Sequence, residues 1–109
     1  MPREAGLPPG TLTLLILRVL NTQALHGYAI AQRIHHFSNE ELAVEEGSLY
    51  PALQKLLLNG WVKANWTTSE SGREVREYRL TPSGRKQLDL LVSDYRRVAG
   101  AIAFLLDRA

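Results

Sequence analysis

The sequence predicts a mainly α-helical fold in which three short helices are followed by a β-hairpin and then by one long helix. Apolar residues recur at helical spacing over the first sixty positions, the pattern changes to strand-like alternation over residues 61–80, and helical spacing returns afterwards. With 109 residues, of which 45% are hydrophobic and 22% charged, the chain has the size and composition of one globular domain.

The third predicted helix lies within Glu45–Gly60, with Gly60 as its left-handed C-terminal residue. Pro51 is tolerable in the first turn if the helix begins near Gly47 or Ser48. Four leucines at helical spacing line the core side: Leu49, Leu53, Leu56 and Leu57. The opposite side carries hydroxyls, an amide, a lysine and a proline, on Ser48, Tyr50, Pro51, Gln54 and Lys55.

Two interpretations of this polar side remain open on the segment alone. It presents hydrogen-bonding groups to the edges of DNA bases, or it is an ordinary solvated surface. The surrounding sequence has to decide between them.

Two helices precede this segment. The first begins at Gly10 or Thr11 and is apolar around much of its circumference, so we expect it to be covered on more than one side. The second runs from His26-Gly27-Tyr28 to about Phe37, with Ile30, Ile34 and Phe37 as its buried stripe. Three short helices with a polar connection before the third predict a helix-turn-helix arrangement, although this connection is longer than in the tightest form.

The alternating pattern after Gly60 predicts a hairpin. Val62, Ala64 and Trp66 share the inward face of its first strand, a turn-rich tip follows, and Tyr78 and Leu80 point inward from its second strand. Three helices followed by such a hairpin form a winged helix. This arrangement favours the DNA-reading interpretation of the third helix, with Lys63, Arg73, Arg76 and Arg79 as candidate phosphate ligands of the wing and Arg73 placed best.

The last helix begins with Thr81 as its cap and Pro82 at its first position. A helix from Ser83 to Asp107 is about 38 Å long, at 1.5 Å per residue. It carries apolar residues at alternating spacings of three and four, namely Leu88, Leu91, Tyr95, Val98, Ile102 and Leu105. Either this helix projects and pairs with a second copy, or it folds back as a core helix; we favour pairing, because the first helix has spare apolar surface to receive it.

Several other classes of protein are disfavoured. Without cysteine the chain has no disulfide and no thiolate metal site, and His35 and His36 point about 100° apart on a helix, so we expect no metal and no cofactor. His26 is better explained as a residue that starts the second helix. No catalytic motif is evident, and the apolar run 12–17 is too short to span a membrane. We expect a non-enzymatic, cytoplasmic protein; its net charge of +2 is weak support for a polyanionic partner.

Several separated motifs carry a resemblance to a known family: residues 10–17 (GTLTLLIL), 25–28 (LHGY), 46–53 (EGSLYPAL), 60–62 (GWV), 69–73 (SESGR) and 78–84 (YRLTPSG). On these segments the chain resembles the PadR family of transcriptional regulators over nearly its whole length. The resemblance implies a homodimeric winged-helix repressor that binds an inverted-repeat operator, and some members release DNA on binding a phenolic or drug-like molecule. In some small members a tryptophan of the last helix stacks on the drug, but this chain has none after Trp66.

The resemblance and the residues together give one set of predictions. Residues 1–9 are a flexible arm, 10–80 a DNA-binding domain and 81–109 a dimerisation helix. The predicted DNA contacts are Ser48, Tyr50, Pro51, Gln54, Lys55, Lys63, Arg73, Arg76 and Tyr28. The predicted dimer interface comprises Leu12, Leu15, Leu88, Leu91, Tyr95, Val98, Ile102 and Leu105. The expected partners are double-stranded DNA, a second copy and a small aromatic or drug-like effector. The alternatives are a winged-helix protein-interaction module and a ligand-sequestering dimer that does not bind DNA.

Overall fold

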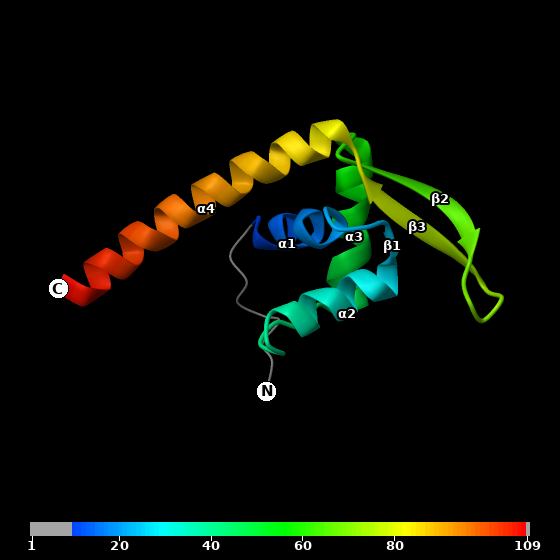
Figure 1. Cartoon of the computed structure of the whole chain (residues 1–109), viewed down its shortest axis with the longest axis horizontal. Coiled ribbons are helices and arrows are strands. Elements are labelled where there is room, and N and C mark those ends of the chain that lie inside the picture. Colours follow the sequence, from blue (N-terminus) through cyan, green and yellow to red (C-terminus); the bar gives the residue numbers. More distant parts are fainter. Residues whose placement is uncertain (1–9, 109) are drawn as a thin grey trace.

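Three helices, a small sheet and one long helix follow each other along the chain in the computed structural model, which describes residues 10–108 (Figure 1). The elements are α1 (Thr11–Leu20), β1 (Leu25–His26), α2 (Gly27–Phe37), α3 (Glu46–Leu58), β2 (Val62–Thr68), β3 (Glu74–Leu80) and α4 (Pro82–Arg108). The predicted fold class is confirmed. The arm predicted for residues 1–9 lies outside the described residues.

The core lies between the first three helices and is closed by the sheet and the start of α4. Its largest fully buried side chains come from α1, α2, α3 and β2: Ile16, Leu17, Ile30, Leu49, Leu53, Leu56 and Val62. As predicted, α3 therefore turns Leu49, Leu53 and Leu56 into the core and leaves Leu57 half-buried, whereas Leu58 at its end is exposed. Burial of one side of α3 fixes which side faces the solvent.

Two predictions about the helices are wrong. Phe37 is 65% exposed instead of buried, because α2 ends there and the chain turns away through Asn39 and Glu40, whose φ angles are 59° and 63°. Pro51 lies in the second turn of α3, since the helix begins at Glu46 and not one or two residues later. Pro51 has no N–H, so the carbonyl of Gly47 loses the hydrogen bond that a regular helix would give it.

A short strand that the sequence pattern does not reveal completes the sheet. β1 pairs with β3, so that the antiparallel strand order is β1-β3-β2. Two residues are too few to show alternation. His26 leaves this strand and caps α2, where its Nδ1 accepts a hydrogen bond from the Ala29 N–H at 3.4 Å. The predicted role of His26 in starting α2 is confirmed.

The hairpin formed by β2 and β3, which we call the wing, has two different faces. Val62, Ala64 and Trp66 pair with Leu80, Tyr78 and Arg76 on the face that turns toward the helices. Trp66 shares that face as predicted, but it is 67% exposed, because the wing extends beyond the helical body (Figure 1). Lys63 pairs with Arg79 on the opposite face.

One buried hydroxyl connects the end of α3, the base of the wing and the start of α4. Thr81 Oγ1 donates to the carbonyl of Gly60 at 2.7 Å and accepts from the Gly84 N–H at 3.0 Å. The Thr81 N–H donates to the carbonyl of Trp61 at 3.1 Å. Gly60 has φ of 74°, the left-handed conformation predicted for it. The predicted cap of α4 is confirmed.

The long helix α4 packs on α1 over its first turns only. Leu88 is 3% exposed and belongs to the core of this chain, so its assignment to a dimer interface is wrong. Leu91 and Val92 are half-buried, and the remainder projects away from the body (Figure 1). Although α4 has 27 residues, no described helix is both long and apolar enough to cross a membrane.

Removal of the Thr81 hydroxyl is expected to destabilise the fold. Thr81→Ala leaves the carbonyl of Gly60 without this donor and the start of α4 without its cap, so we expect a loss of about 2 kcal/mol in the free energy of unfolding. Denaturant titration at a fixed chain concentration measures it. Thr81→Ser keeps the hydroxyl and is the matched control; an equal loss in both variants would contradict the role given to the hydroxyl.

Candidate nucleic-acid interface

The outer side of α3 is open to solvent, as the sequence predicts. All five of its predicted contact residues are exposed: Ser48, Tyr50, Pro51, Gln54 and Lys55. They stand on a helix whose opposite side is held by buried leucines, so their positions are fixed by the core. A rigid helix with hydroxyl, amide and ammonium groups along one side has the chemistry needed to contact base edges and phosphates.

Tyr50 belongs partly to this surface and partly to the fold. It is 44% exposed, yet its ring lies against Gly27 at the start of α2, so that a Cβ at Gly27 would come within 2.7 Å of the phenol oxygen. Burial raises the pKa of Tyr50, and the charges of Glu46 and Tyr78 raise it further. Tyr50 is a neutral phenol, as tyrosines are at neutral pH, and can donate a hydrogen bond. The contact joins two of the sequence motifs, His26-Gly27-Tyr28 and Ser48-Leu49-Tyr50-Pro51.

A groove lies between the wing, the start of α2 and the first half of α3. Its volume is about 740 Å³, and it brings together four of the predicted DNA contacts, namely Tyr28, Tyr50, Arg73 and Arg76. The remaining predicted contacts of α3 lie outside this groove on the exposed side of the same helix. Lys63 is the one predicted DNA contact that lies neither in the groove nor on α3. The register places it on the other face of the sheet, beside Arg79.

The arginines of the wing differ in what they contact. Arg79 forms an ion pair with Glu77 at 3.5 Å on the outer face. Arg76 lies over the ring of Tyr78, 5.9 Å from its centroid, on the groove face. Arg73 has no ion pair among the described residues, and the tip holds its backbone through a hydrogen bond from the Ser69 N–H to the Arg73 carbonyl at 2.8 Å. Arg73 and Arg76 are thus available to a ligand in the groove.

The groove also contains residues that the sequence reasoning did not assign to it. Trp66 lines it from β2, and two carboxylates, Glu46 and Glu74, line it from α3 and β3. The alternating pattern along β2 predicted which face of the strand carries Trp66, but it did not predict that Trp66 is exposed to solvent. For the carboxylates the only signal was their position, in the first turn of α3 and beside the tip of the wing.

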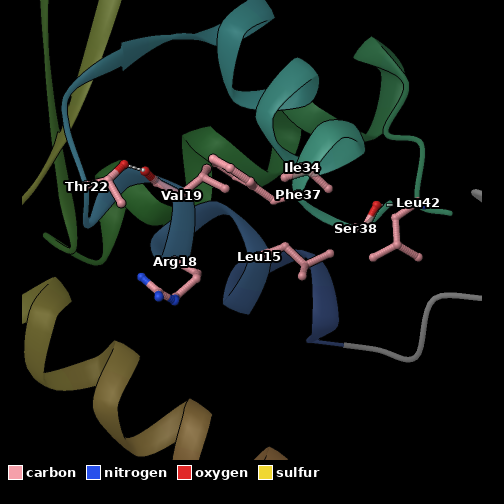
Figure 2. A pocket seen from close by; sticks show the side chains of 8 residues that line it. All are labelled: Leu15, Arg18, Val19, Thr22, Ile34, Phe37, Ser38 and Leu42. Carbon is pink, nitrogen blue, oxygen red and sulfur yellow. Dashed lines mark hydrogen bonds between the residues drawn. The ribbon is translucent and has the colours of Figure 1, made fainter. Parts of the chain in front are cut away.

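A separate, mostly apolar cavity lies between α1, α2 and the segment that follows α2. Figure 2 shows its lining, which is Leu15, Arg18, Val19, Thr22, Ile34, Phe37, Ser38 and Leu42. Its volume is about 460 Å³, within the usual range of small-molecule sites. The hydroxyls of Thr22 and Ser38 are already bonded to backbone carbonyls, those of Val19 and His35. Arg18 therefore supplies the charge of the lining.

The fold and the surface define a class of protein. A helical body with a polar, solvent-facing third helix, beside a hairpin that holds two arginines at a groove, is a winged-helix DNA-binding protein. The sequence model of the Transcriptional regulator PadR-like family matches residues 16–90. The chain belongs to this family of transcriptional regulators.

The chain is also similar to individual proteins, in sequence or in structure. An uncharacterised protein X of Lysinibacillus sphaericus is 28% identical and matches over 90% of each chain. The solved structure of a transcriptional regulator from Clostridium thermocellum is 26% identical, with a TM-score of 0.78 over 86% of this chain and 91% of that one. A PadR-like transcriptional regulator from Bacillus cereus, 23% identical with a TM-score of 0.79 over 92% and 95% of the two chains, shows the same fold.

The contact between Tyr50 and Gly27 predicts a strong energetic coupling. Gly27→Ala is expected to destabilise the protein by about 1 kcal/mol or more, because the added methyl displaces the Tyr50 ring. In a Tyr50→Ala background the same methyl has room and is expected to be neutral or stabilising, since alanine is the better helix former. Free energies of unfolding of the four proteins of this double-mutant cycle give the coupling. If the changes in unfolding free energy of the two single variants add up to that of the double variant, the two residues do not press on each other.

Proposed function

We propose that this PadR-like regulator is a homodimeric repressor that places two copies of α3 in successive major grooves of an inverted-repeat operator. The observation that carries the proposal is the polar, exposed side of α3 beside a groove that contains Arg73 and Arg76. In this proposal Ser48, Tyr50 and Gln54 contact bases or phosphates, Pro51 makes apolar contact with a base, and the wing binds the flanking phosphates. Occupation of the operator then blocks a promoter. The proposed location of the protein is the cytoplasm, where it meets the DNA.

The projecting part of α4 supports the homodimer. Tyr95, Val98, Ile102 and Leu105 remain exposed at spacings of three and four, which is the pattern of a helix that packs against another helix. Leu12 and Leu15 of α1 are half-buried and offer further apolar surface. Pairing along α4 would set the distance between the two α3 helices, which must be about 34–36 Å to reach successive major grooves on one side of the duplex.

A small-molecule effector stays a prediction. The cavity shown in Figure 2 has an apolar lining and a volume that suit a small aromatic molecule.

Binding of labelled duplexes tests the DNA contacts. We expect specific binding to the upstream region of the gene itself, with an affinity that falls steeply as salt rises. Gln54→Ala should relax sequence preference, whereas Arg73→Ala should weaken all duplexes alike and reduce the salt slope by about 2, because each dimer loses two arginines. Fluorescence anisotropy at several salt concentrations measures both effects.

The matched control for Arg73 is Arg79→Ala, which removes the same charge from the same hairpin but from the face opposite the groove. It should leave the salt slope close to that of the unaltered protein. Equal effects of the two arginine variants would contradict the proposed docking face. Absence of binding to every duplex would favour the alternative of a protein-interaction module.

Val98→Asp tests the dimer. Val98 lies in the middle of the exposed apolar series, and a carboxylate there would have to be buried unpaired between the two helices, which costs several kcal/mol. We expect a monomer by size-exclusion chromatography with light scattering. Arg97→Asp, at the adjacent and strongly exposed position, is the control and should remain dimeric. A dimer that survives Val98→Asp would refute pairing along this side of α4.

A further inference from the structure

Trp66 is a large aromatic residue that the fold does not use. Its neighbours on the same face of the wing become progressively buried toward the base, where Ala64 is half-buried and Val62 is 2% exposed. Trp66 lies farther out, beside Arg76 in the register, and two-thirds of its surface faces solvent. An exposed tryptophan contributes little to the core, so its presence here needs a different reason.

The surroundings of Trp66 indicate what contacts it. It lines the same groove as Tyr28, Tyr50, Arg73 and Arg76, which offer phenol hydroxyls and guanidinium groups. A DNA strand presents anionic phosphates and apolar sugars in regular alternation. The guanidiniums suit the phosphates, while a flat indole suits the carbon-rich surface of a deoxyribose or of an unstacked edge of a base.

We propose that Trp66 packs against the sugar–phosphate backbone of the DNA strand that runs between α3 and the wing. This inference rests on the proposed function, and it adds a residue of different chemistry to it. Contacts between arginine and phosphate are driven by the release of counterions and weaken as salt rises. The contact of an indole with a sugar is apolar and nearly independent of salt. The wing therefore binds DNA by two mechanisms that a salt titration separates.

The chain is well suited to test the environment of Trp66 directly. It contains two tryptophans, and Trp61→Phe leaves Trp66 as the only one. In this variant we expect emission typical of an exposed indole and strong quenching by acrylamide. Addition of saturating duplex should shift the emission to shorter wavelength and reduce the acrylamide quenching constant at least about twofold, because the indole leaves water.

Affinity gives a second and independent measurement. Trp66→Ala should weaken binding about tenfold at every salt concentration, with the slope of log K against log [salt] unchanged. Arg76→Ala should instead lower that slope by about 2, one contact for each chain of the proposed dimer. Trp66→Phe keeps an aromatic ring and should recover most of the affinity. Leu58→Ala, which removes a side chain that is 78% exposed at the far end of α3, is the control and should bind as the unaltered protein does.

The outcomes distinguish this inference from the proposed function. If duplex binds but the acrylamide accessibility of Trp66 is unchanged, or if Trp66→Ala binds normally, the inference is wrong and the proposed function stands. If Trp66→Ala changes the salt slope as Arg76→Ala does, the effect is electrostatic and the inference is also wrong. If no duplex binds the unaltered protein, both fall together. Circular dichroism and thermal unfolding of Trp66→Ala, expected to match the unaltered protein, exclude misfolding as the cause of a loss.

Discussion

The hydrogen bonds of Thr81 are the constraint on which the arrangement of this molecule depends. Its hydroxyl and its N–H bind the carbonyls of Gly60 and Trp61, where α3 ends and the wing begins, and the same hydroxyl caps α4. The direction of α4 is therefore fixed relative to α3 and to the wing at one buried point. If two copies join along α4, the spacing of their α3 helices is set through this junction, and a change in the direction of α4 acts on the DNA-facing elements through it.

The second constraint lies at the other end of α3, where Tyr50 presses against Gly27. The same side chain that helps form the exposed surface also sets the distance between α2 and α3. The phenol is held by packing against Gly27. A contact surface that is fixed before binding loses less conformational entropy when it binds. Together, Thr81 and Tyr50 fix α3 at both ends, so that it is a rigid element of the candidate interface.

The sequence predicted best those features that depend on neighbours along the chain. The apolar spacing of α3, the left-handed Gly60, and the Thr81-Pro82 start of α4 are all local signals, and the structure confirms them. The errors about burial share a different cause, since burial depends on where the helical body ends. Phe37 and Trp66 have apolar side chains on the expected faces but lie beyond the packed region, whereas Leu88 continues a heptad pattern yet lies within it.

The same limit applies to the candidate site. Periodicity gave the outward side of α3, but it did not show that the wing would bring Trp66, Glu46 and Glu74 into one groove with the predicted tyrosines and arginines. Such a juxtaposition depends on the pairing of β1 with β3, which anchors the start of α2 to the wing. A strand of two residues leaves no periodic signal, so the sequence could not reveal this pairing.

The charge of the groove explains why a protein of this design needs more than electrostatics. Arg73 and Arg76 share the groove with Glu46 and Glu74, so the guanidiniums and carboxylates in its lining are equal in number. The two carboxylates offset part of the attraction that the two guanidiniums exert on phosphates, so we expect the groove to bind an arbitrary duplex less tightly than arginines alone would. That weakness favours selectivity, because a regulator must find its site among a large excess of other DNA. If two copies bind together as proposed, affinity for the correct site comes from base contacts, apolar packing and joint binding, since linking two weak sites multiplies their effect only when both fit the spacing of the operator.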